Sequence, residues 1–434
     1  MKTPNAFADI SFIKALPAAC SLLLLSACGS SSSTNTAEPQ HRLGSLPETV
    51  IHPASTPTSQ AKVELGRTLF WDPIMSAGKD VACVTCHHPD AGYADGLDIS
   101  IGVGGQGLAA DRKFGTFAMR NAPTVLNTAF NSIDHTGNYD PSQAMMFWDN
   151  RLKSLEKQAL GPIESREEMR GFSNNAVSEA ITDSIRNLIS ADMHSAQTIS
   201  HTADNQLIAD LGAASEKVLS TGRENNLGQM VDIVVLRLKK YPEYLQLFQN
   251  AFGDTSITAD TITAQRIGQA IAAFERSLIN NNTPFDRYAR GDNNALTQEE
   301  VRGLNAFMAA GCNVCHSGPM FSDFELHQLP VPVNNKQPDD RGVNGKFRTP
   351  TLRNLASTAP YMHNGTKADL KSAIRFYHGI SNPSGDPDLS QLKLSSDDAT
   401  IEAIEKFLLT LSDDNFDKTI PASVPSGLNP GGDI

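Results

Sequence analysis

Two Cys-x-x-Cys-His strings constrain this chain more than any other feature of its sequence. One occupies residues 83–87 and the other residues 312–316. Two thiols three positions apart can bond to the two vinyl groups of one haem, and the adjoining imidazole can then bind its iron. The sequence therefore predicts two covalently bound haem c groups. The residues that would hold them are Cys83, Cys86 and His87 for the first haem and Cys312, Cys315 and His316 for the second.

The N-terminus has the pattern of an export signal. Lys2 and Lys14 precede an apolar run over residues 15–27. Thirteen helical residues extend about 20 Å at ~1.5 Å each, which is short of the ~30 Å hydrocarbon core of a membrane. We therefore expect residues 1–27 to be a signal peptide rather than a membrane span.

The end of this segment, Leu-Ser-Ala-Cys over residues 25–28, resembles a bacterial lipobox, in which the cysteine becomes the lipidated first residue. Gly29 follows, in place of the Asp that the lipoprotein pattern associates with inner-membrane retention. The pattern predicts a periplasmic protein anchored to the outer membrane by a lipid at Cys28, with a flexible tether over residues 28–50. An ordinary signal cleavage near Ala27 is the alternative.

The other cysteines help to decide what the two strings bind. The chain has six Cys, and the two outside the strings, Cys20 and Cys28, lie near the N-terminus. A Cys-x-x-Cys string can also form a redox pair or bind zinc, so a zinc site with four thiolates from both strings is the alternative. Two such strings in an exported chain with no other thiol beyond position 28 favour haem.

Hydrophobic periodicity indicates a mainly α fold, and strand-like alternation is scarce. Thr297 and Glu300 form a capping-box pattern ahead of an apolar face that leads to the second string. An amphipathic helix is expected to begin at Ser396 or Asp397 and to close the fold. Another helix is predicted from the apolar residues Ile267, Ile271, Phe274 and Leu278.

These elements predict two cytochrome c-like domains, each wrapping one haem with long loops. We expect the N-terminal haem domain to cover residues 51–255 and the C-terminal haem domain to cover residues 256–420, followed by a tail over residues 421–434. The formal charge of 36 − 48 = −12, without a long basic stretch, argues against a nucleic-acid partner, because such proteins neutralise phosphates with clustered Lys and Arg.

The sixth ligand of each iron sets its chemistry, because an open iron binds peroxide whereas a filled one mainly passes electrons. Residues 89–118 contain no His or Met, so we expect the first iron to be open. Met119 is the nearest soft ligand, and beside Arg120 we expect it to pack or to position the loop. For the second iron the local candidates remain Met320, Met362, His363, Tyr377 and His378.

Three long stretches, over residues 100–124, 147–169 and 348–365, resemble the bacterial dihaem cytochrome c peroxidase family, which includes the MauG branch. They contain strings such as Arg-Asn-Ala-Pro-Thr, Phe-Trp-Asp-Asn-Arg and Ala-Pro-Tyr-Met-His-Asn-Gly in the order in which the family has them. The resemblance implies a peroxidatic first haem and an electron-transfer second haem.

The resemblance also implies roles for individual residues. Trp148 matches the family's Trp that relays electrons between the haems. Gln158 and Glu168 match the polar residues on the distal face of the peroxidatic haem, where a carboxylate can move a proton between the two peroxide oxygens. Without the resemblance, Glu168 would be interpreted as a solvated acid, since Glu164 and Glu167 are close to it in sequence.

The resemblance implies a Ca²⁺ site as well. Asn121, with the backbone carbonyls of Thr358 and Pro360, matches the family's calcium site between the domains, and hard oxygen ligands suit this ion. A capped loop asparagine is the alternative interpretation of Asn121.

Two positions depart from the ordinary peroxidase pattern. Val103 stands where the family has a removable distal His, which implies a first haem that is open without prior reduction. Tyr377 stands where the family has an axial Met, as in the MauG branch. A phenolate is a hard donor that favours ferric iron and lowers its potential. Packing of Tyr377, with ligation by His378 or Met362, is the alternative.

Residues 171–227 form a polar insertion relative to the family, and its His194 and His201 are a weak candidate for a metal site. The leading hypothesis is a peroxidase that reduces hydrogen peroxide with electrons from a small c-type cytochrome or copper protein. The alternatives are a MauG-like enzyme that uses peroxide-oxidised haems to oxidise residues of a partner protein, and a non-catalytic dihaem electron carrier.

Overall fold

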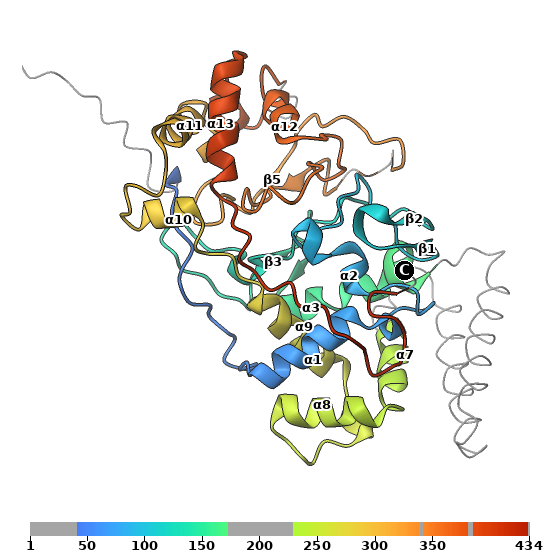
Figure 1. The fold of residues 1–434 in the computed structure, drawn as a ribbon. Coiled ribbons are helices and arrows are strands. Elements are labelled where there is room, and N and C mark those ends of the chain that lie inside the picture. The colour runs from blue at the N-terminus through green and yellow to red at the C-terminus, as the bar shows by residue number, and fades with distance from the viewer. Residues whose placement is uncertain (1–40, 172–228, 338–339, 341, 381–384, 433–434) are drawn as a thin grey trace, which may run out of the picture. The chain divides into compact units, whose positions relative to one another are not determined.

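Helices joined by long loops dominate the computed structural model, which describes residues 41–171, 229–337, 340, 342–380 and 385–432 (Figure 1). The helices are α1 Gln60–Trp71, α2 Cys83–Cys86, α3 Leu155–Gln158, α4 Gly161–Glu164, α7 Gln229–Leu238, α8 Pro242–Phe252, α9 Ala264–Ser277, α10 Pro284–Ala289, α11 Gln298–Ala309, α12 Leu370–Phe376 and α13 Asp398–Leu409. The predicted signal peptide, the proposed lipid site at Cys28, and the insertion histidines His194 and His201 lie outside the described residues.

The strands of the described segments form three two-stranded antiparallel ribbons. These pair β1 Gly105–Gln106 with β2 Lys113–Phe114, β3 Met145–Met146 with β4 Leu152–Lys153, and β5 Leu326–His327 with β6 Phe347–Arg348. The prediction of a helical fold with long loops and few strands is confirmed. The assignment of one haem to each of two domains remains a prediction.

Local capping signals fix where several helices begin. The Thr297 Oγ1 accepts a hydrogen bond from the Glu300 backbone N–H at 3.3 Å, and the Glu300 carboxylate accepts one from the Thr297 N–H at 2.6 Å. This reciprocal box starts α11, as predicted. Asp397 caps α13 by accepting from the Thr400 N–H at 2.8 Å, which selects one of the two predicted starts.

Two main hydrophobic cores organise the fold. The first is built by α1, α7, α8 and α9, and the second by α10 to α13. Helix α9 was expected in the C-terminal domain, but it packs against α1 in the first core. Gly66 allows this close approach, because a Cβ there would lie 2.0 Å from the Ala270 carbonyl oxygen. The cores therefore separate between Leu278 and Phe285 rather than near residue 255.

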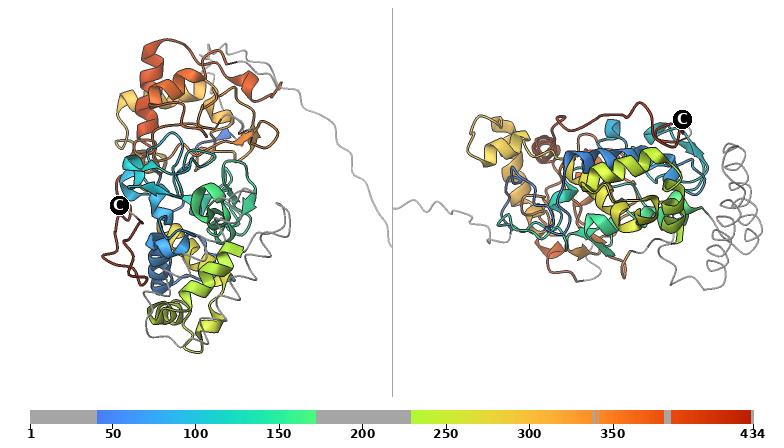
Figure 2. Two further views of the ribbon diagram at one scale, coloured as in Figure 1. Left: turned by 90° about the vertical axis from the view of Figure 1, so that its right-hand side faces the viewer. Right: turned by 90° about the horizontal axis from the view of Figure 1, so that it is seen from below.

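The chain after α13 returns to the first half and ends beside the first cysteine string (Figures 1 and 2). Asp417 pairs with Arg67 at 2.6 Å, and Val424 is buried in the first core. The Thr85 hydroxyl, between the two cysteines, donates a hydrogen bond to the Gly431 carbonyl at 2.8 Å. The C-terminal segment thus holds the first string in place.

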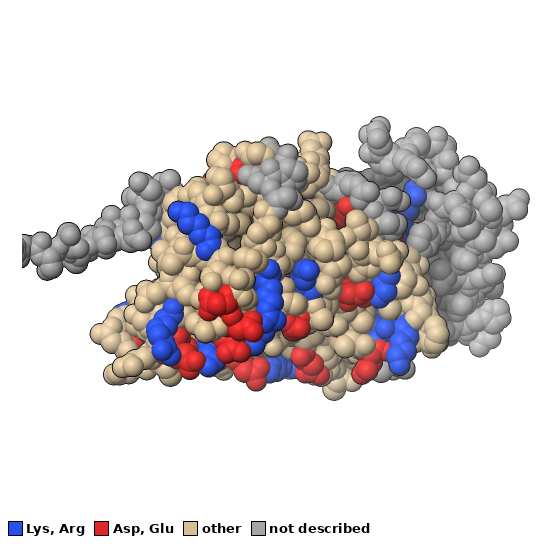
Figure 3. Space-filling model, turned by 90° about the horizontal axis from the view of Figure 1, so that it is seen from above, with Lys and Arg blue, Asp and Glu red and all other residues tan. Residues whose placement is uncertain are grey.

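Acidic and basic side chains are interspersed on the face that Figure 3 shows. The α11–α13 helices that lie at this end carry exposed pairs such as Lys371 with Glu402 and Arg375 with Asp398. Such a mixed surface favours solubility and does not single out a partner by charge. No helix among the described residues is long and apolar enough to span a membrane.

Candidate active site between the two cysteine strings

One cavity of about 560 Å³ is lined by residues of both cysteine strings. Its lining includes every residue that the sequence predicted for haem attachment, for the distal face and for calcium. These are Cys83, Cys86, His87, Asn121, Trp148, Gln158, Glu168, Cys312, Cys315, His316, Thr358, Pro360 and Tyr377. Residues from segments almost 300 positions apart are thus brought to one site.

Both histidines of the strings are oriented in the same way. The Nδ1 atom of His87 lies 3.1 Å from the Tyr93 carbonyl oxygen, and that of His316 lies 3.0 Å from the Phe321 carbonyl oxygen. An Nδ1–H that donates to a carbonyl leaves the Nε2 lone pair available to a metal. Burial lowers the pKa of both rings, which favours the neutral form that binds iron.

The cysteines fit covalent haem better than zinc. All four are free of disulfides, and Cys83 and Cys86 lie on the short turn of α2. Within the described segments, no cluster of metal-ligating groups contains thiols of both strings. A four-thiolate zinc site therefore has no geometric support, whereas a cavity that joins two thiol pairs and two oriented imidazoles fits two haems.

The distal side of the first site carries the two polar residues that the resemblance singled out. Gln158 ends α3, and its buried Oε1 has no hydrogen-bond partner. Glu168 lies in the π-helical turn η6 Arg166–Arg170, and burial raises the pKa of its carboxyl group. Both side chains line the cavity, so both can meet a small molecule bound there.

Val103 does not belong to the cavity lining. Its side chain is half-buried against the first core, and its backbone N–H donates to the Glu167 carbonyl at 3.3 Å. The preceding Gly102 lies so close to this turn that a Cβ would be 1.8 Å from the same carbonyl oxygen. Gly102 and Val103 therefore pack against the backbone of the turn that carries Glu168.

The candidate ligands for the second iron differ in whether they reach the cavity. Tyr377 follows α12 and lines the cavity, and burial raises the pKa of its hydroxyl far above the usual value, with the nearby Cys312 and Cys315 adding to the shift. His378 is exposed and its Nδ1 lies 3.1 Å from the Leu394 carbonyl oxygen. Met320, Met362 and His363 line the cavity as Tyr377 does, so His378 is the one of the five sequence candidates that is outside the cavity lining.

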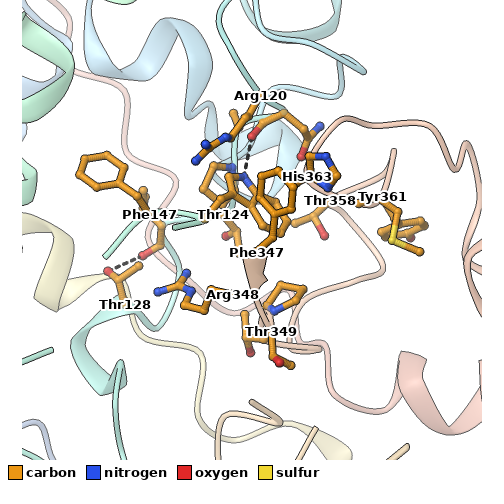
Figure 4. Close-up of a pocket in the computed structure, with 18 of the residues that line it drawn as sticks. Arg120, Thr124, Thr128, Phe147, Phe347, Arg348, Thr349, Thr358, Tyr361 and His363 are labelled. Carbon is orange, nitrogen blue, oxygen red and sulfur yellow. Dashed lines mark hydrogen bonds between the residues drawn. The ribbon is translucent and has the colours of Figure 1, made fainter. Parts of the chain in front are cut away.

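Trp148 lines the same cavity as both cysteine strings. Figure 4 shows Arg120, Phe347 and His363 in this cavity. The Trp148 indole N–H donates to the Asn121 carbonyl at 3.0 Å, and its ring lies edge-on to His363 with centroids 6.5 Å apart. His363 stacks on Phe347 with centroids 3.7 Å apart, and the Arg120 guanidinium covers Phe347 at 5.1 Å. The indole is therefore held by a hydrogen bond and by an aromatic stack.

The residues of the expected calcium site surround the same region. The Asn121 backbone N–H donates to the His363 carbonyl at 2.9 Å, and its side-chain amide donates to the Leu97 carbonyl at 2.7 Å. Thr358 and Pro360 lie on the loop that leads to His363 and line the cavity. Asn121 is thus brought beside the loop that would supply the carbonyl ligands.

Sequence reasoning missed two titratable residues in this cavity, Glu275 and His327. His327 lies between the carboxylates of Asp323 and Asp386, each 2.9 Å from one ring nitrogen. Glu275 is an acid on the otherwise apolar inner face of α9. An acid inside a run of apolar helix residues was the only local signal that could have pointed to Glu275.

Comparison with known proteins agrees with this geometry. The family described as di-haem cytochrome c peroxidase matches residues 60–203 and 186–294. The chain is 30% identical over 339 residues to the methylamine utilization protein MauG of Methylorubrum extorquens, covering 76% of this chain and 72% of that protein. It is 29% identical over 386 residues to the cytochrome c551 peroxidase of Nitrosomonas europaea, covering 86% of both.

Solved structures show the same fold. A MauG-like protein associated with microbial copper homeostasis matches with a TM-score of 0.56 and 22% identity, over 87% of this chain and 95% of that chain. The diheme peroxidase BthA from Burkholderia thailandensis matches with a TM-score of 0.50 and 20% identity, over 89% and 98%. The fold and the paired strings define a dihaem c-type protein. The chain belongs to the di-haem cytochrome c peroxidase family, which confirms the resemblance.

Proposed function

We propose that this protein is a dihaem peroxidase that reduces hydrogen peroxide at the first haem and receives electrons through the second. Peroxidases and MauG proteins among its relatives support this activity. The observation that carries the proposal is the single cavity that joins both cysteine strings to Gln158 and Glu168. When bound, the haem groups supply iron that binds and cleaves peroxide and that exchanges electrons.

The chain's own residues would manage protons on the distal side. The buried surroundings of Glu168 raise its pKa and so bring it closer to the pH range in which an acid can both give and take a proton. The orphan Oε1 of Gln158 can accept a hydrogen bond from bound peroxide and orient it. Residues 89–118 supply no His or Met to compete for that face.

Trp148 would connect the two sites. Its hydrogen bond to the Asn121 carbonyl and its contact with His363 fix the ring in the cavity that both strings line. A fixed indole between two redox groups shortens the electron path and needs little rearrangement when charge passes. We assign the first haem to the half built on α1 and α9 and the second to the half built on α11 and α13.

A MauG-like activity is the second candidate. It is favoured by Tyr377, which lines the cavity, and by Val103, which stands where the family has a removable distal His. In this case the electrons would come from residues of a partner protein instead of a small c-type cytochrome or copper protein.

We also propose a cellular location for the protein and a bound metal ion in addition to the haem iron. We place the protein in the periplasm, held at the outer membrane by the lipid on Cys28. We also propose Ca²⁺ at Asn121 with the carbonyls of Thr358 and Pro360, because all three residues line the cavity and hard oxygen ligands suit this ion.

The test is a hydrogen peroxide titration of the purified, fully oxidised holoprotein, followed by visible and near-infrared absorption. Reaction without prior reduction would support an open first site, and a long-lived near-infrared band would favour the MauG-like candidate. A need for reduction first would mean that a ligand blocks the first iron. Two six-coordinate haems without any high-spin ferric signal would instead indicate an electron carrier.

A further inference from the structure

Glu275 is a buried acid that lines the cavity, and the peroxide chemistry proposed above does not use it. Its side chain lines the cavity together with Cys83 and His87, and only 3% of the residue is exposed. Its Oε2 atom is buried and has no hydrogen-bond partner. A lone carboxyl oxygen in such a place costs free energy unless it carries a proton or meets a ligand.

The helix that carries Glu275 turns it toward the distal side. Helix α9 packs against both α1 and α3 (Figure 1). Gly268, Ala272 and Glu275 share one face of α9 by their spacing. A Cβ at Gly268 would lie 2.4 Å from the Glu156 carbonyl oxygen of α3, and Ala272 packs in one cluster with Leu155 of α3. Glu275 therefore continues the face that meets the helix ending in Gln158.

The neighbouring charges leave Glu275 without a dedicated counter-ion. The Arg276 guanidinium forms an ion pair with Glu156 at 2.7 Å. Burial raises the pKa of Glu275 to about 8, with Arg276 opposing the shift and Glu156 adding to it. Burial likewise raises the pKa of the Cys83 thiol to about 12, and both Glu275 and Glu168 add to that shift, so the two acids lie near the same thiol.

Two buried or half-buried arginines on the helices packed against α9 are engaged elsewhere. Arg67 of α1 pairs with Asp417 at 2.6 Å, and Arg237 of α7 donates to the backbone carbonyls of Ser76 and Ala77. Neither is placed to neutralise a Glu275 carboxylate. Burial in these surroundings therefore favours the protonated form of the Glu275 carboxyl group.

Reducing one hydrogen peroxide to two waters consumes two electrons and two protons. We propose that Glu275 is a second proton donor of the first haem site, which supplies a proton during the reductive half of the reaction and regains it from solvent. The O–H bond of its carboxyl group breaks and the proton joins the oxygen that leaves as water, while both electrons come from the donor protein. This inference rests on the proposed peroxidase function.

Three holoproteins test the inference: wild type, Glu275→Gln and Glu275→Asp, with the surface variant Glu299→Gln as a matched control. Infrared difference spectra between the resting and peroxide-treated proteins would detect a protonated carboxyl group. We expect its C=O band in wild type and in Glu299→Gln, a shifted band in Glu275→Asp, and no such band in Glu275→Gln. Equal haem content and thermal midpoints would show that the variants fold.

Stopped-flow kinetics then separate the two halves of the reaction. We expect peroxide cleavage to be unchanged in Glu275→Gln and the reductive phase to slow by about tenfold or more. In wild type the reductive phase should slow as the pH rises through about 8, because the carboxyl group loses its proton, and the variant should lack this inflection.

An unchanged C=O band in Glu275→Gln, or a reductive phase as fast as wild type with the same inflection, would overturn the inference. Wild type that fails to turn over peroxide with any reduced donor would overturn the proposed function instead. In that case a C=O band lost in Glu275→Gln would still show which residue holds the proton, so the two failures are distinguishable.

Discussion

The two cysteine strings have the same attachment chemistry but lie in different surroundings. The first forms the helical turn α2, and its Thr85 accepts from the Ala82 N–H at 2.9 Å and donates to Gly431. The second lies in the 3₁₀ turn η8 Cys312–Val314 after Gly311, whose φ of +79° suits glycine. A distant segment holds each string: the C-terminal segment contacts the first at Thr85, and His41 near the start of the described chain contacts the second at Asn313 and Val314.

The larger difference lies on the other side of each site. Gln158, Glu168 and Glu275 surround the first string, and Tyr377 faces the second. None of these residues lies within 50 positions of the string that it faces, so the string alone predicts a haem but not its reaction. Acids and an amide suit proton transfer, whereas a phenol suits ligation, and this contrast underlies our proposal that peroxide reacts at the first site.

Removing one pair of cysteines at a time is the strongest test of the proposed difference between the two haem sites. Cys83→Ala with Cys86→Ala should leave one covalent haem per chain and abolish reaction with peroxide. Cys312→Ala with Cys315→Ala should also leave one haem, but with peroxide binding retained and electron supply lost. Haem content by alkaline pyridine spectra and peroxide titration would check this. Identical behaviour of the two variants would remove the functional distinction between the sites.

Glu168→Gln tests the acid of the first site. We expect the rate of peroxide cleavage to fall by about 10²- to 10⁴-fold, because the amide cannot move a proton between the peroxide oxygens. Single-turnover kinetics of the holoprotein would measure this. Glu325→Gln, an exposed acid near the second string, is the matched control and should keep the wild-type rate. An equal fall in the rate of peroxide cleavage in both variants would mean that the loss of one negative charge, and not the position of Glu168, causes the effect.

Arg353→Met should destabilise the second half. Arg353 and Asp286 are fully buried and form a two-pronged ion pair with both distances 2.9 Å. Removing one partner leaves a buried charge, at a cost of about 3–5 kcal/mol in the free energy of unfolding. Denaturation of the holoprotein would measure this. Adding Asp286→Leu should recover much of the loss, although Asp286 also accepts from the Leu46 N–H.

Tyr377→Phe and His378→Phe sharpen the ligand assignment of the second site. Loss of a phenolate ligand should change the ferric absorption and spin-resonance spectra and raise the second haem potential by on the order of 0.1 V. His378 is exposed, so its replacement should leave both unchanged. A spectrum that responds to His378→Phe, or to Met362→Leu but not to Tyr377→Phe, would reject the tyrosine.

The sequence predicted features that depend on residues close together in the chain, and it did not predict features that depend on contacts between distant residues. The capping boxes are local patterns, so the starts of α11 and α13 were predicted correctly. The haem strings are local patterns as well, and the haem-attachment residues that they name remain a prediction. The packing of α9 against α1 in the first core could not be predicted, because Gly66 and Ala270 meet only in the folded chain. The return of the C-terminal segment to Thr85 has no local signal either.

The site residues divide in the same way. Trp148, Gln158 and Glu168 came from the resemblance, and the structure brings their side chains to the cavity that the strings line. Glu275 could not be found, because an acid inside an apolar helix pattern gives no indication of which cavity it faces. Burial and the absence of a partner, which mark it out, exist only in three dimensions.

The smallest expected effects compare the helices that lead to the two strings. Ser59 caps α1 by accepting from the Lys62 N–H at 3.1 Å, and Thr297 caps α11 with the reciprocal bond from Glu300. Ser59→Ala and Thr297→Ala should each lower the free energy of unfolding by about 1 kcal/mol.

The loss should be larger for Thr297→Ala, because that substitution also frees Glu300 from its partner hydroxyl, which lies 2.9 Å from the carboxylate. Thr297→Ser keeps the hydroxyl and is the control that should stay within a few tenths of a kcal/mol of wild type. Thermal unfolding of the holoproteins would measure all three. If Ser59→Ala proved much the more damaging, the first half would depend on its entry helix more than on the C-terminal segment that closes over it.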